Sequence, residues 1–276
     1  MPAGIPDPAA LPPAGSMRWY AWLFASPAAR PLVAVAFALE MELRSIPDAR
    51  VDHGVAHLKL QWWREEFLRL EQGRPRHPLT QSALNAAPDA GSAWQPMQDL
   101  LSSLELDLAC ATYETEAELD RYFALADGLQ RVVAAVPGPT DARVERFASA
   151  TGQAARGIEI IRDLRKDAVD GRVYLPLAWL DAEGIDHNEL RAESMSPGAR
   201  RCLTRLAAKL RERSQRARQA LIESDFAALR GQIVFLGLHT ALLDQIEREQ
   251  FEVGRRRHML GPMQSLWTAW RVARQH

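Results

Sequence analysis

Thr140–Pro176 reads TDARVERFASATGQAARGIEIIRDLRKDAVDGRVYLP and predicts the long helix around which the fold is organised. Thr140 or Asp141 can cap its N-terminus after a Pro-Gly-Pro break, and Gly171 can end it. Apolar residues recur every three or four positions along two adjacent lines of this helix. A helix that is apolar on two sides is largely buried, so we expect it at the centre of the molecule.

Three carboxylates, Glu159, Asp163 and Asp167, lie four residues apart along this helix and border one of its apolar lines. Like charges at this spacing oppose helix formation by roughly 0.2–0.5 kcal/mol per pair, and partial burial raises the cost. We therefore expect positive charge to face them. Basic neighbours on the same helix are one source: Arg162, Arg165 and Lys166. The other is a divalent cation, because carboxylate oxygens suit Mg²⁺, which also bridges to phosphates.

The segment from Asp163 to Pro176, DLRKDAVDGRVYLP, resembles the second aspartate-rich motif of the squalene/phytoene synthase family, RDxxxDxxxGRxYLP. Other stretches agree with the family in the same order: Pro27 to Ala38, Trp62-Trp63-Arg64 with the later Pro78, and Leu104 to Gly128. The resemblance spans roughly residues 18–270. Four ordered segments make it specific.

This resemblance implies an all-α, single-domain helical bundle of the isoprenoid (terpenoid) synthase type around a central cavity. In such enzymes two facing acidic motifs hold Mg²⁺ ions, which grip a prenyl diphosphate and draw off its pyrophosphate. Asp163 and Asp167 would bind Mg²⁺, with Glu159 continuing their line, and Tyr122 would line the catalytic pocket. The groups that would contact diphosphate are basic: Arg156, Arg162, Lys166 and Arg172.

The first acidic motif of the family, approximately YAFCRxxDDxxD, should fall within FALEMELRSIPD at 37–48, where most of it is lost. One register leaves Asp48 at the last aspartate, and the other leaves Glu42 at the first. The expected metal ligand from this helix is therefore Asp48 or Glu42. Upstream of the second motif, Arg156 and Glu159 replace a glutamine and an asparagine of the family. We expect these two to neutralise each other at their i, i+3 spacing.

Two functions remain open. The first is a Mg²⁺-dependent transferase of isoprenoid biosynthesis that joins prenyl diphosphates head to head. The second is a pseudoenzyme on the same fold, because the altered first motif resembles a family branch that assists assembly of respiratory complex I. An open apolar tunnel ending at Asp163 and Asp167 would favour binding of an isoprenyl diphosphate or similar lipid. A tunnel filled by Met41 and Arg156 would favour the role toward a protein partner.

Outside the motifs, the pattern predicts helices almost throughout and little strand-like alternation. Residues 1–16 are rich in proline and alanine, so we expect a flexible tail before one domain at 17–276. The expected helices are 17–26, 29–46, 51–73, 92–111, 115–136, 140–170, 197–223, 225–250 and 262–274. Shorter helical pieces are expected near 80–85, 175–180 and 187–190.

Composition narrows the partners and the location. A net charge of −1 and the lack of a basic patch interleaved with aromatic residues argue against nucleic acid. Cys110 and Cys202 fall in helical patterns and indicate reduced core residues of a cytoplasmic protein. The longest apolar runs are well short of the ~18 residues of a membrane span. At the C-terminal end, arginines at 255–257 and tryptophans at 267 and 270 suit peripheral contact with the inner face of an anionic membrane, or docking on the domain itself.

Overall fold

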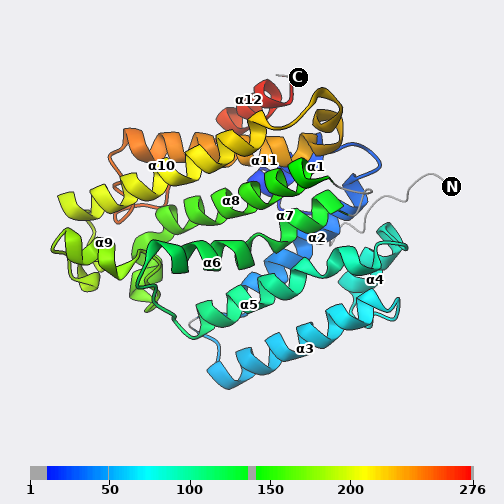
Figure 1. Ribbon diagram of the computed structural model, residues 1–276, viewed down its shortest axis with the longest axis horizontal. Coiled ribbons are helices and arrows are strands. Elements are labelled where there is room, and N and C mark those ends of the chain that lie inside the picture. Colours follow the sequence, from blue (N-terminus) through cyan, green and yellow to red (C-terminus); the bar gives the residue numbers. More distant parts are fainter. Residues whose placement is uncertain (1–10, 49, 136–140, 275–276) are drawn as a thin grey trace.

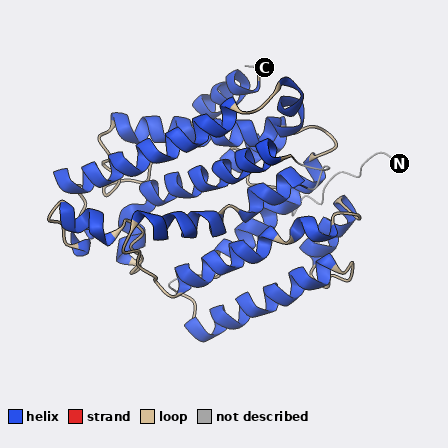
Figure 2. Ribbon diagram, viewed as in Figure 1, coloured by secondary structure: helices blue, strands red, loops and turns tan. Residues whose placement is uncertain are grey.

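The computed structural model describes residues 11–48, 50–135 and 141–274, and these residues form helices and loops without a strand (Figure 2). The helices are α1 (Met17–Phe24), α2 (Arg30–Arg44), α3 (His53–Glu71), α4 (Pro78–Ala86), η2 (Gly91–Trp94), α5 (Pro96–Leu108), α6 (Glu116–Ala126), α7 (Gly128–Ala135), α8 (Ala142–Val169), α9 (Leu177–Ala182), η3 (His187–Arg191), α10 (Pro197–Gln219), α11 (Glu223–Arg248) and α12 (Pro262–Ala273). The predicted all-α bundle is confirmed.

The central helix is α8, which contacts α6, α7, α10 and α11 (Figure 1). Asp141 caps its N-terminus by accepting hydrogen bonds from the backbone N–H groups of Arg143 and Val144 at 2.8 and 3.1 Å. At the other end, Gly171 adopts a φ of +86°. The Arg172 N–H then donates to the Asp167 carbonyl at 2.7 Å. These bonds form a Schellman motif, which ends the helix where the sequence predicted and turns Arg172 back toward it.

The helix predicted at 115–136 is wrong in one respect, because it is divided into α6 and α7 at Asp127. The cause is a tertiary contact of the first residue of α7. A Cβ on Gly128 would lie only 2.1 Å from the carbonyl oxygen of Pro96, at the start of α5. The backbone of Gly128 therefore lies directly against the start of α5. Two helices that meet at an angle, α6 and α7, replace the single helix at this point (Figure 1).

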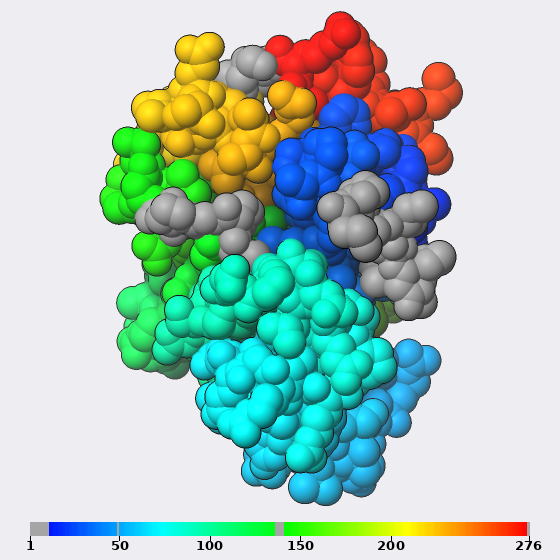
Figure 3. Space-filling view, turned by 90° about the vertical axis from the view of Figure 1, so that its right-hand side faces the viewer, coloured from blue at the N-terminus to red at the C-terminus, as the bar shows by residue number. Residues whose placement is uncertain are grey.

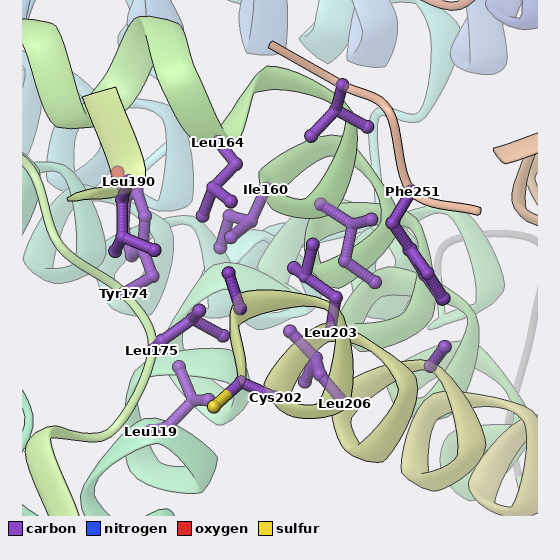
Figure 4. Close-up of a cluster of buried hydrophobic side chains, with 14 of the residues drawn as sticks. Leu119, Ile160, Leu164, Tyr174, Leu175, Leu190, Cys202, Leu203, Leu206 and Phe251 are labelled. Atoms are coloured by element: carbon purple, nitrogen blue, oxygen red, sulfur yellow. The ribbon is translucent and has the colours of Figure 1, made fainter. Parts of the chain in front are cut away.

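The core around α8 is filled by side chains in three clusters, and α8 contributes to each of them. Figure 4 shows Ile160 and Leu164 of α8 meeting Leu203 and Leu206 of α10. Tyr174 to Leu190 close the side of this cluster, with Cys202 buried beside them. Cys110 does not follow the prediction of a core position, since it is exposed at the end of α5 with a φ of +49°.

The first and last helices, α1 and α12, contact each other at one edge of the bundle. The predicted tail lies partly outside the described residues, and from Pro13 the chain forms a turn in which Ser16 caps α1 through the Trp19 N–H at 3.1 Å. Among the described helices, α11 alone has the length and apolar content of a membrane span, but 61% of the relevant window is buried. It contacts α1, α8 and α12, so it serves as a core helix of the bundle.

Candidate functional site

A cavity of about 540 Å³ lies against the C-terminal half of α8. Its walls come from α8, the start of α1, the end of α2 and the loop that leads into α12. Most of the lining side chains are ionisable: Arg18, Arg44, Asp48, Asp107, Arg156, Glu159, Arg162, Asp163, Lys166, Asp167, Arg172, His239, Arg257 and His258. The structure thus brings together nearly all the candidate residues that the sequence singled out on this helix.

Each carboxylate of the acid stripe, Glu159, Asp163 and Asp167, is bound by a guanidinium group. Arg18 of α1 donates to Glu159 at 3.3 Å, across 141 residues of sequence. Asp163 accepts from its neighbour Arg162 at 2.5 and 3.1 Å. It also accepts two bonds from Arg257, at 2.8 and 3.1 Å. The positive charge therefore arrives largely from distant segments.

Asp167 is bound by Arg172, whose Nη2 lies 3.3 Å from its Oδ1. The Schellman turn after α8 places Arg172 there. The local partners predicted for the stripe are correct for Arg162 and wrong for the other two basic residues. Lys166 donates to Asp170 at 2.9 Å, and Arg165 donates to the Arg191 carbonyl at 2.9 Å.

The pKa values of the stripe follow these partners. Burial alone would raise the pKa of Glu159, but the charges of Arg18, Arg162 and Arg44 and the contact with His239 together outweigh it and hold that pKa well below its usual range. Burial would also raise the pKa of Asp163. The hydrogen bonds and charges of Arg162 and Arg257 outweigh this effect, so the pKa of Asp163 is lowered. For Asp167 burial wins, and its pKa is raised despite Arg156 and Arg172 nearby.

The facing helix α2 presents a different pair of residues from those the sequence predicted. Buried Glu40 accepts hydrogen bonds from Arg18 and Arg44, both at 2.9 Å. Glu42, a predicted metal ligand, is exposed and does not line the cavity, so the structure does not bring it to the acid stripe. Asp48 does lie on the cavity rim, but it accepts from Arg50 through the backbone N–H and the guanidinium at 2.9 Å each.

The floor of the cavity is a buried cluster centred on Asp107 of α5. Its carboxylate accepts from the hydroxyls of Tyr122 and Tyr174 at 2.9 and 2.7 Å, and from Arg156 at 3.1 Å. Arg156 also donates to the oxygens of Tyr122 and Tyr174 at 2.7 and 2.8 Å. The predicted neutralisation of Arg156 by Glu159 is wrong, because each finds its partner on another helix.

Burial raises the pKa of both tyrosines, so they remain neutral donors to Asp107. Tyr122 is only 1% exposed and lies behind Asp107 and Arg156, whereas Tyr174 reaches the cavity wall. Sequence reasoning missed Asp107 as a site residue. Its signal was a carboxylate on the apolar face of α5, in line with Leu100 and Leu104.

The donor set does not fit the two-motif magnesium cluster that the resemblance implies. Both oxygens of Asp163 are held by guanidinium groups, and Glu40, the buried carboxylate of α2, is itself held by Arg18 and Arg44. Within residues 11–48, 50–135 and 141–274, no group of three or more His, Cys, Asp or Glu side chains is placed to hold a metal ion. Magnesium would have to break existing ion pairs to bind here.

The cavity fits neither alternative for the tunnel in full. Arg156 does occupy the floor of the cavity, as the pseudoenzyme interpretation required. Met41 does not contribute, since it is 42% exposed on the outer face of α2. The purely apolar side chains of the cavity wall are few: Met17, Pro47, Leu104, Met259 and Leu260.

Comparison with known proteins gives a consistent result. The family model described as squalene/phytoene synthase matches residues 11–264. The phytoene synthase of Thermus thermophilus is 31% identical over 216 residues, which cover 72% of this chain and 68% of that protein. A bifunctional lycopene cyclase/phytoene synthase of Pyrenophora tritici-repentis is 32% identical over 126 residues, or 41% of this chain, and the chain spans only 22% of that larger protein.

Solved structures show the same fold. A dehydrosqualene synthase in complex with ligand superposes with a TM-score of 0.77 at 16% identity, over 93% of this chain and 90% of that one. The squalene synthase HpnC from Alicyclobacillus acidocaldarius gives a TM-score of 0.69 at 23% identity, over 84% of this chain and 88% of that one. At these identities the likeness establishes the arrangement of helices.

Proposed function

The chain belongs to the squalene/phytoene synthase family, and from this premise we propose that it binds an isoprenyl diphosphate or a related anionic lipid without joining prenyl groups head to head. The synthases of this family are transferases of isoprenoid biosynthesis. The observation that carries the proposal is the capture of the acid stripe by arginines. The chain's own cations occupy the position that metal ions would take.

The balance of charge supports an anionic ligand. Seven side chains that line the cavity are basic and five are carboxylates, which leaves an excess of positive charge. Within the described part of the chain, the Nη1 of Arg44 is buried without a hydrogen-bond partner. Guanidinium groups bind phosphate oxygens in pairs of parallel hydrogen bonds, so phosphate recognition does not require a metal ion.

The same lining argues against the transfer reaction. Departure of pyrophosphate would leave an allylic cation, which needs an apolar, water-free surrounding. Here the wall beside the stripe consists mainly of charged groups, and the interior behind it is filled by the core shown in Figure 4. An allylic cation would lie among guanidinium groups, which would destabilise it by like-charge repulsion.

Isothermal titration with a non-hydrolysable farnesyl diphosphate analogue tests the proposal, with Mg²⁺ and with EDTA. We expect binding in EDTA, weakened by Arg162→Gln and strengthened by Asp163→Asn, because the latter releases two guanidinium groups. Arg146→Gln, in a separate groove between α8 and α10, is the matched control and should bind normally. Incubation with farnesyl or geranylgeranyl diphosphate should give no condensed product.

Two results would overturn the proposal in different directions. Binding that requires Mg²⁺ and disappears in Asp163→Asn/Asp167→Asn, together with product formation, would establish a synthase. A complete lack of binding would favour the second candidate, a role toward a protein partner. That candidate is supported by the stripe itself, whose three carboxylates are already satisfied by the chain and need no ligand.

A further inference from the structure

The helix α12 has two faces of opposite character. Its small residues pack inward against α1 and α11: Ser265, Thr268, Ala269 and Val272. Its large apolar residues point outward at the i, i+3, i+4, i+7 spacing of a single stripe: Met263 (86% exposed), Leu266 (50%), Trp267 (56%) and Trp270 (46%). Met259, in the preceding loop, is 69% exposed. Burial of such side chains is favourable, so this exposed stripe is suited to a partner.

The charge around this stripe identifies the partner. Residues 255–274 contain five arginines and no aspartate or glutamate. Arg271 stacks over Trp267 with its guanidinium carbon 4.5 Å from the ring centroid, and Arg274 stacks over Trp270 at 4.3 Å. Tryptophan and arginine side chains are the residues of a helix that lies in the interface of an anionic bilayer. We propose that α12 and its preceding loop dock this protein on an anionic lipid membrane.

A second copy of the chain fits this surface poorly. Arg256 and Arg257 are paired with Glu249 and Asp163 of their own chain. A symmetric dimer would still place Arg255, Arg271 and Arg274 of one copy against the same residues of the other, and the segment 255–274 holds no carboxylate of its own to compensate. Docking on the chain's own domain is already accomplished by the small-residue face. The stripe is therefore left for a partner that is both apolar and negatively charged, as a membrane surface is.

The cavity lies next to the proposed docking segment. Met259, Leu260 and Ser265 line the cavity and also belong to the docking segment. Arg257, in the same loop, binds Asp163 on the cavity wall. An anionic lipid head group at the membrane surface would thus lie beside the cavity mouth. This step from docking to delivery rests on the proposed function, whereas the docking itself does not.

Vesicle flotation tests the proposal with the full chain, using phosphatidylcholine vesicles with and without phosphatidylglycerol. We expect binding to the anionic vesicles, weakened by salt. Arg271→Gln/Arg274→Gln should lower the partition coefficient about fivefold per arginine. Leu266→Ser/Trp267→Ser should abolish binding. The matched control is Leu58→Ser/Trp62→Ser, which removes exposed apolar residues from α3 at the opposite end of the molecule (Figures 1 and 3) and should bind normally.

Two further measurements keep the result unambiguous. Quenching of wild-type tryptophan emission by brominated lipids reports insertion even if a variant folds poorly. Titration of the farnesyl diphosphate analogue without vesicles should be unchanged in the α12 variants, which separates a failure of docking from a failure of the cavity to bind. The proposal is overturned if the α12 variants float like wild type, if no vesicle binds the protein, or if the variants instead convert a dimer into a monomer.

Discussion

Replacement of Asp107 by asparagine should destabilise the protein by about 3 kcal/mol, because it leaves a buried guanidinium without its counter-charge. The side chains of Asp107 and Arg156 are only 5% and 13% exposed, so solvent screens their interaction weakly. Removal of one partner from a buried ion pair typically costs about 3–5 kcal/mol. We expect the lower value, since asparagine retains one oxygen for the hydroxyls of Tyr122 and Tyr174.

A double-mutant cycle measured by urea denaturation at pH 7 isolates the pair. Arg156→Met alone should cost less than Asp107→Asn, because two tyrosine hydroxyls still satisfy Asp107. The combined variant should be at least about 1 kcal/mol more stable than the sum of the single losses predicts. Asp99→Asn on the same helix is the control, and its half-exposed pair with Arg131 should contribute about 0.2–1 kcal/mol. Additive losses, or equal losses for Asp107→Asn and the control, would refute the reasoning.

Further predictions concern packing and acid stability. Gly157→Ala should cost about 1–3 kcal/mol, because the new methyl group would lie 2.5 Å from Leu210 Cδ1, and Leu210→Ala should relieve part of that loss in thermal melts. The lowered pKa values of Glu159 and Asp163 stabilise the fold above about pH 4.5, and this stabilisation should be lost as the pH falls through those lowered values. In a plot of the urea midpoint against pH, Glu159→Gln/Asp163→Asn should therefore show a smaller decrease at acid pH than wild type. Burial raises the pKa of Asp127, so its ionisation costs stability as the pH rises, and Asp127→Asn should gain on wild type as the pH rises above about 4; a constant difference would contradict this assignment.

Local signals were sufficient to predict most of the helices. Asp141 and Gly171 bound α8 through hydrogen bonds and a backbone conformation that depend only on nearby residues. The division of α6 from α7 could not be predicted in this way, because it results from the contact of Gly128 with the backbone of α5. A glycine in a helical pattern signals a close approach only when its neighbour in space is known.

Sequence patterns predicted which carboxylates line the site, but they did not predict all the side chains that pair with them. Glu159, Asp163 and Asp167 line one cavity as their spacing required. Local rules found Arg162, but two other partners could not be found in this way, because Arg18 and Arg257 lie 141 and 94 residues from the carboxylates that they bind. Periodicity locates a carboxylate on a helix face, but it carries no information about which distant segment covers that face.

The capture of Asp163 by Arg257 also has a consequence for synthesis on the ribosome. The two residues are 94 positions apart, so at elongation rates of about 5–20 residues per second the aspartate is made roughly 5–20 s before its arginine. During that interval Asp163 of the nascent helix α8 has its neighbour Arg162 as a partner but lacks the two hydrogen bonds from Arg257. The pairing of this carboxylate is therefore complete only late in synthesis, and a ribosome that stalls before Arg257 would leave this side of the helix without the loop that covers it.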